Sequence, residues 1–127
     1  MSKTASTAKK KALTTERIAR LCAEYASNKK AEDVLVLDLR GISSLADFFV
    51  VCSGTSEPHL KAIAAEIEDK MRDEHALRPH NVDGRPLSQW IVVDYYDVLV
   101  HIFHAEKRAF YSLEDLWSDA PRLTITQ

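Results

Sequence analysis

The sequence predicts a single-domain α/β protein in which a mixed β-sheet is flanked by helices. Two kinds of segment alternate along the chain. Short runs rich in Val, Ile and Phe are typical of strands, and stretches with apolar residues three or four positions apart are typical of helices. A chain of 127 residues can bury one core without disulfides. A sheet layered with helices is the arrangement that lets both patterns share that core.

The first half of the chain predicts a helix, two strands and a second helix. The first helix begins at Thr14 or Thr15 and ends near Asn28. Two strands follow, at residues 34–39 and 48–52, joined by about eight residues, which is too many for a tight hairpin. The second helix is capped by Ser56 and ends near His75. Both strands read as buried on two faces, because their apolar runs are nearly continuous.

The second half predicts a hairpin that leads into a helical tail. Residues 76–89 contain turn residues and form a loop, with or without one short strand. The apolar runs 90–93 and 98–103 form the hairpin, with residues 94–97 as its turn. Residues 109–117 have helical spacing, and Ser112 with Asp115 resembles a capping box. This order of elements fits either a two-layer or a three-layer arrangement of helices on the sheet.

Charge is distributed unevenly along the chain. Residues 1–30 carry eight Lys and Arg against two Glu, a net charge of +6, whereas residues 31–127 carry nine against seventeen acidic residues, a net charge of −8. An acidic body is poorly suited to gripping phosphates and better suited to a basic protein partner. Residues 1–13 are expected to be a disordered basic tail, residues 14–120 a domain and residues 121–127 a C-terminal tail.

The sequence predicts a reduced, cytoplasmic setting. Cys22 and Cys52 stand in apolar surroundings without a pairing motif. No apolar run approaches the roughly 18 residues that a membrane span needs, so no membrane partner is expected.

Residues that could carry chemistry are few, and each has a structural interpretation. Gly54-Thr55-Ser56 precedes a helix and could hold a phosphate, but it lacks Walker spacing, so a capped turn is favoured. Asp94 and Asp97 flank a turn, where Asp bonds nearby backbone. His101 and His104 point to opposite faces of a strand and cannot share a metal. We therefore predict no catalytic residues, no metal and no cofactor.

Several segments together resemble the ribosomal silencing factor family, also called the iojap-like family. They are residues 33–56 (DVLVLDLRGISSLADFFVVCSGTS), 82–84 (VDG), 90–104 (WIVVDYYDVLVHIFH) and 111–117 (YSLEDLW). The resemblance covers about residues 15–120. It implies a nucleotidyltransferase-like α/β fold and binding to a basic ribosomal protein, protein fourteen of the large subunit. Such proteins block joining of the small subunit and repress translation when nutrients are short. With a ribosome as the partner, the lysines of residues 1–13 are expected to offer a weak contact with ribosomal RNA.

The resemblance also implies which residues make the ribosomal contact. They lie on the sheet near Trp90 and in the tail: Trp90, Val92, Asp94, Tyr95, Tyr96, Asp97, Arg108, Tyr111 and Trp117. Judged from its residue type alone, Trp90 could equally be a core residue. The family often has Gly where Tyr96 stands, so a turn with positive φ there would strain Tyr.

Three functions are open at this point. A translational repressor and an assembly factor for the large subunit would share the same contact and differ in timing. An active nucleotidyltransferase would need clustered carboxylates for two metals, and the strands offer only Asp38 and Asp94 without a D-x-D motif. The protein is therefore expected to be a repressor and not an enzyme, and to be a monomer or homodimer when free.

Overall fold

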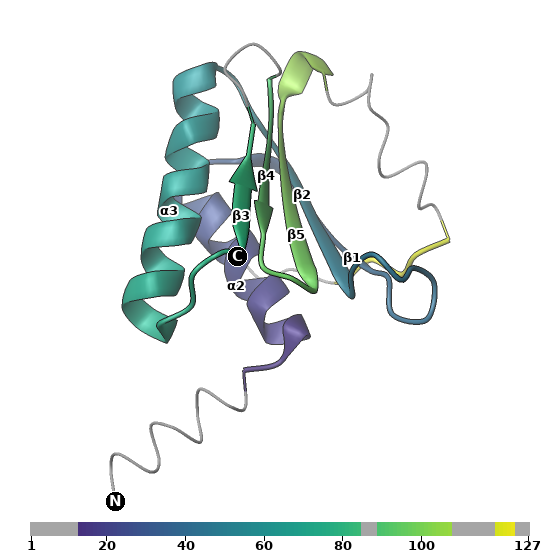
Figure 1. The fold of residues 1–127 in the computed structure, drawn as a ribbon. Helices are drawn as coiled ribbons and strands as arrows, with labels where there is room; N and C mark the ends of the chain where they lie inside the picture. Colours follow the sequence, from purple (N-terminus) through teal and green to yellow (C-terminus); the bar gives the residue numbers. More distant parts are fainter. Residues whose placement is uncertain (1–12, 85–88, 108–118, 124–127) are drawn as a thin grey trace, which may run out of the picture.

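The computed structural model describes residues 13–84, 89–107 and 119–123. Its helices and strands (Figure 1) are, in chain order, α2 (Thr15–Asn28), β1 (Glu32–Asp38), β2 (Phe48–Gly54), α3 (Glu57–His75), β3 (Asn81–Asp83), β4 (Trp90–Asp94) and β5 (Val98–His104). The predicted helices, strands and hairpin are confirmed, and the short strand in the loop is present as β3. The predicted helical tail falls largely in 108–118, outside the described residues.

The strands form one mixed sheet in the order β1-β2-β5-β4-β3. β2 pairs with β5 in parallel, and the other neighbouring strands are antiparallel. The predicted mixed sheet is therefore confirmed. The finer nucleotidyltransferase-like assignment stays a prediction.

Both described helices lie against the same face of the sheet, which gives a two-layer arrangement in the described part (Figure 1). Ile63, Ile67 and Met71 of α3 are fully buried there. The helices are also joined to each other, because the Tyr25 hydroxyl of α2 donates a hydrogen bond of 2.9 Å to the Glu74 carboxylate of α3. Burial and this carboxylate raise the pKa of Tyr25. On the outer side of α3, the Lys70 ammonium lies 3.6 Å from the Glu74 carboxylate.

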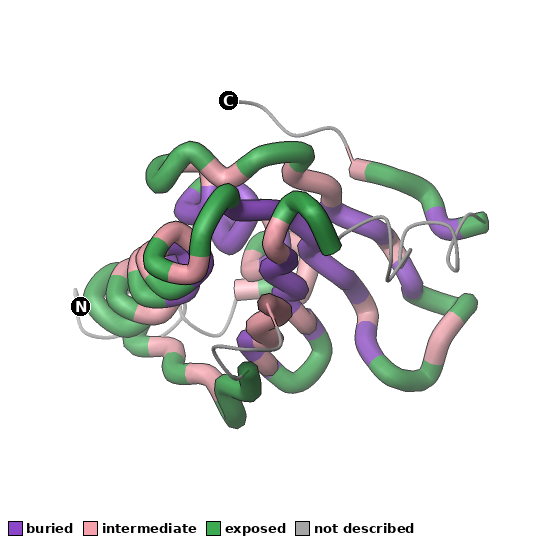
Figure 2. Tube along the Cα trace, turned by 90° about the horizontal axis from the view of Figure 1, so that it is seen from above, coloured by how far each residue is buried: buried purple, intermediate pink, exposed green. Residues whose placement is uncertain are grey.

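The opposite face of the sheet has a second apolar cluster. Its buried residues are Leu37, Leu39, Ala46, Phe49, Val51, Phe103 and Ala120. All seven residues of β2 are buried, because this strand is covered on both faces as predicted. In Figure 2 the buried residues run through the sheet and along the inner sides of the helices.

Two segments that the sequence assigns to tails contact the folded body. Leu13 packs against the helix-side core. Beside β1, the Asp38 amide donates a hydrogen bond of 2.8 Å to the Pro121 carbonyl, and the Leu123 amide donates one of 2.9 Å to the Val36 carbonyl. Residues 121–123 therefore cover the outer edge of β1, where unpaired backbone groups could otherwise pair with another strand.

The β4–β5 hairpin turns through two residues, Tyr96 and Asp97, since the Tyr95 amide donates to the Val98 carbonyl at 2.9 Å. Tyr96 has a φ of +70°. A positive φ at the first residue of a two-residue loop is what favours Gly there. Tyr96 is 63% exposed, and the centroid of its ring lies 4.7 Å from that of His80. The strain expected from the Tyr–Gly difference is therefore present in the turn.

We predict that Tyr96→Gly is more stable than Tyr96→Ala by roughly 0.5–1 kcal/mol. Both substitutions remove the ring and its contact with His80, so their difference isolates the backbone strain. Urea unfolding of the two variants measures it.

Two substitutions, one just after α3 and one within it, calibrate this result. Ala76 follows the helix with a φ of +54°, so Ala76→Gly should also stabilise. Exposed Ala65 lies in mid-helix, so Ala65→Gly should destabilise by about 1 kcal/mol. Equal stability of the two Tyr96 variants, with both controls behaving as expected, would show that the turn relaxes at no cost.

Candidate functional site

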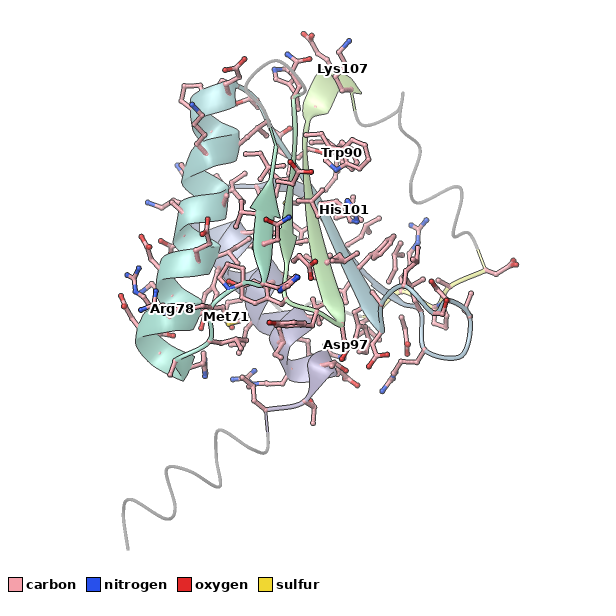
Figure 3. All side chains as sticks on the ribbon, in the orientation of Figure 1. Met71, Arg78, Trp90, Asp97, His101 and Lys107 are labelled. Atoms are coloured by element: carbon pink, nitrogen blue, oxygen red, sulfur yellow. The ribbon has the colours of Figure 1, made fainter. Side chains whose placement is uncertain are left out.

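The residue on which the sequence focuses, Trp90, lies at the start of β4 on the sheet face that carries neither helix (Figure 3). Alternate residues of β4 and β5 share this surface, because successive side chains on a strand point to opposite faces. We call it the Trp90 face, and it comprises Trp90, Val92, Asp94, Leu99, His101 and Phe103. Trp90, Val92, Asp94 and Leu99 are half-buried, whereas His101 and Phe103 are buried.

Among the described residues, Phe103 and His101 hold the Trp90 indole in place. Its ring centroid lies 5.0 Å from that of Phe103, the residue directly opposite it on β5. Its Nε1–H donates a hydrogen bond of 3.2 Å to Nδ1 of His101. Trp90 is therefore both a packing residue and a partly exposed one, so neither the core nor the surface interpretation alone describes it.

His101 is buried, with 6% of its surface exposed. The Phe49 ring of β2 contacts it edge-on, with the centroids 4.6 Å apart. Burial lowers the pKa of His101 to about 4, because a charged imidazole would lose its hydration. The imidazole is therefore neutral near pH 7. Since Nδ1 accepts the Trp90 hydrogen bond, the ring proton sits on Nε2.

That proton has no acceptor among the described residues. A buried donor without a partner costs about 1–3 kcal/mol. An apolar side chain would avoid this cost at the same position. Sequence reasoning missed His101 as a site residue, because it weighed the histidine only as a metal ligand.

The turn below the Trp90 face is held by its own aspartates. The Asp94 carboxylate accepts a hydrogen bond of 2.7 Å from the Tyr96 amide. The Asp97 carbonyl accepts hydrogen bonds of 2.7 and 3.1 Å from the amides of Asp47 and Phe48. The structural interpretation is confirmed for Asp94, whose side chain bonds the turn backbone, whereas the hydrogen bonds at Asp97 use its backbone carbonyl. Within the described ranges, no group of three or more His, Cys, Asp or Glu side chains could hold a metal ion.

Not every predicted contact residue is available at the surface. Tyr95 lies in the helix-side core and is 4% exposed, because it alternates with Asp94 and points toward the helices. Its assignment to the contact is therefore corrected. Arg108, Tyr111 and Trp117 lie outside the described residues, and their roles stay predictions.

The Gly54-Thr55-Ser56 turn is a capped helix start, as the sequence analysis favoured. The Ser56 hydroxyl accepts from the His59 amide at 3.2 Å. The Thr55 amide donates to Nδ1 of His59 at 2.9 Å. Two backbone donors that a phosphate would need are thus already in use.

A small cavity of about 230 Å³ lies between α3 and the β3–β4 pair. Its walls are mainly apolar, with Leu60 and Ala64 on one side and Val82 and Ile91 on the other. This volume is below the roughly 300–1,000 Å³ of small-molecule sites. It fits a contact for one or two side chains better than a substrate pocket.

The fold and the site define a small α/β protein whose prominent feature is an aromatic sheet surface. The chain belongs to the ribosomal silencing factor family: the family described as "Ribosomal silencing factor during starvation" matches residues 12–127. "Ribosomal silencing factor RsfS" of Bacillus subtilis is 43% identical over 104 residues, covering 82% of this chain and 87% of that protein. The chloroplastic "Protein Iojap" of Arabidopsis thaliana is 31% identical, covering 81% of this chain and 42% of that protein.

Solved structures show the same fold. A Bacillus halodurans protein superposes with a TM-score of 0.73 at 36% identity, covering 87% of this chain and all of that one. A Chromobacterium violaceum protein gives 0.77 at 26% identity, covering 90% and 93%. Membership of this family supports a ribosome-associated, regulatory role. In the part of the chain that the structure describes, no helix is long and apolar enough to cross a membrane.

We predict that His101 makes the protein less stable in mild acid. Its folded-state pKa of about 4 lies below the ordinary value of 6.5, so the unfolded chain binds the proton more readily. The contribution is complete above pH 6.5 and is lost as the pH falls toward 4, up to about 3 kcal/mol. Urea unfolding at a series of pH values measures it.

His101→Asn should remove this part of the pH dependence. As a matched control, His80→Asn replaces an exposed histidine and should keep the wild-type profile. If His101→Asn and the wild type lose stability in parallel between pH 6.5 and 4, His101 is not the group responsible.

Proposed function

We propose that this protein binds the large ribosomal subunit through the Trp90 face and blocks joining of the small subunit. The contact is made with a basic ribosomal protein, which the family resemblance suggests is protein fourteen of the large subunit. The observation that carries the proposal is a half-buried Trp90 whose indole is already fixed by Phe103 and His101.

Binding energy at protein interfaces is concentrated in a few residues, with Trp prominent among them. A free Trp side chain must lose rotamer freedom when it docks, which weakens binding. Here the hydrogen bond and the ring contact order Trp90 before any partner arrives. The half-buried side chains of Val92 and Leu99 extend the apolar surface around it.

Charge favours a basic partner. Residues 31–127 carry a net charge of −8, with nine Lys and Arg against seventeen Asp and Glu. Asp94 lies on the Trp90 face, and Asp97 is exposed in the adjoining turn. Opposite charge on the two partners speeds their encounter and disfavours wrong partners.

The proposed mechanism needs no chemical step. A folded body of this size, bound where the two subunits meet, excludes the small subunit by volume. The family description, silencing during starvation, supports a role when nutrients are short.

We predict that Trp90→Ala weakens binding to the large subunit by about 2 kcal/mol or more, since it removes the anchor of the contact. Cosedimentation with purified large subunits over a range of protein concentrations measures the affinity.

Arg78→Ala is the matched control, because exposed Arg78 lies on the side of the molecule away from Trp90 (Figure 3). Circular dichroism must show that both variants are folded. A folded Trp90→Ala variant that binds as tightly as the wild type would remove Trp90 from the contact.

We further predict that adding the protein to separated subunits prevents their joining in proportion to the amount bound and without nucleotide. Light scattering and gradient sedimentation at matched concentrations measure joining. Normal joining with the protein demonstrably bound would contradict steric silencing and favour the assembly-factor function.

A further inference from the structure

We propose that His101 is the positioning residue of the Trp90 face: its imidazole holds the Trp90 indole in the orientation that the ribosomal partner recognises. The inference rests on the proposed function only in taking Trp90 as the contact residue. It assigns to His101 a role in binding without requiring that His101 touch the partner.

The strand register brings the two side chains together. Trp90 is paired with Phe103 and Val92 with His101, so Trp90 and His101 are diagonal neighbours on one face. His101 belongs to β5, the middle strand, which is paired on one side with β2 and on the other with β4. Its backbone is thus fixed by two ladders, whereas Trp90 stands at the end of β4. His101 therefore offers the Trp90 indole an acceptor whose backbone position is fixed by the sheet.

Apart from Trp90, the described neighbours of His101 give no reason for a histidine at this position. Its nearest strand partners are Val51 and Val92, and the Phe49 ring packs edge-on against it. An apolar side chain would suit these neighbours and would leave no buried donor without a partner. The property that an imidazole adds is an acceptor at Nδ1, and the group that uses it is the indole N–H of Trp90 at 3.2 Å.

Removing the acceptor takes away the hydrogen bond that orients the indole N–H. The ring contact with Phe103 remains, but the indole N–H no longer has the His101 imidazole as its acceptor. The ring can then turn toward water to satisfy its N–H, and binding must first restore the original orientation. A variant without the acceptor should therefore bind more weakly although Trp90 itself is unchanged.

The test compares His101→Phe, which fills the site without an acceptor, with His101→Asn, whose Oδ1 can replace Nδ1. The first readout is hydrogen exchange of the Trp90 indole N–H by NMR, with the signal assigned by its loss in Trp90→Phe. We expect exchange at least about tenfold faster in His101→Phe and close to wild type in His101→Asn. The second readout is cosedimentation with large subunits, where His101→Phe should bind about tenfold more weakly and His101→Asn should recover most of the affinity.

A measurement on the wild type keeps the test independent of folding of the variants. The imidazole ¹⁵N shifts of His101 should show the tautomer with the proton on Nε2 and a bare Nδ1. A proton on Nδ1 would overturn the proposal, because Nδ1 could not then accept from Trp90. Unchanged indole exchange in a folded His101→Phe variant would overturn it as well.

The binding data separate this inference from the proposed function. If Trp90→Ala loses affinity while folded His101→Phe keeps it, His101 has no positioning role and the Trp90 contact stands. If Trp90→Ala binds normally, the contact surface is wrong, and the exchange and tautomer data then describe only an internal hydrogen bond.

Discussion

The alternation of side chains along β5 is the constraint on which the rest of the structure depends. Val98, Val100 and Ile102 point to the helices, and Leu99, His101 and Phe103 point to the opposite face. A shift of one residue in the pairing would exchange these two sets. The helix-side core and the Trp90 face would be lost together. β5 is held against such a shift by β2 on one side and β4 on the other.

The sequence was sufficient to predict the helices, the strands and the hairpin, because their apolar residues follow clear periods. The sheet order was not predictable in the same way. The parallel pairing of β2 with β5 joins residues such as Phe48 and Val98, which are far apart in the chain. Periodicity reports which face of a strand is apolar, and it carries no information about which strand will be its neighbour.

Some features of the candidate site could also be predicted from the sequence, and others could not. Trp90 could be singled out from its residue type and place, and the strain at Tyr96 from its departure from the family's Gly. Tyr95 was assigned wrongly, because its face depends on where the turn begins. The Trp90–His101 hydrogen bond depends on the hairpin register. If the turn is known to contain two residues, the alternation of side chains along the strands places Trp90 and His101 on one face. The missing information was therefore the length of the turn.

The sheet order has a consequence for how the protein folds while a ribosome is synthesising it. Among the described strands β5 comes last in the chain, yet it lies in the middle of the sheet. Until it is made, β2 and β4 have no shared neighbour, and the sheet exists only as separate pieces. Contacts between distant parts of a chain form slowly, because a long loop must close first. A nascent chain that ends before β5 therefore has no Trp90 face, and a truncated product cannot imitate the complete protein.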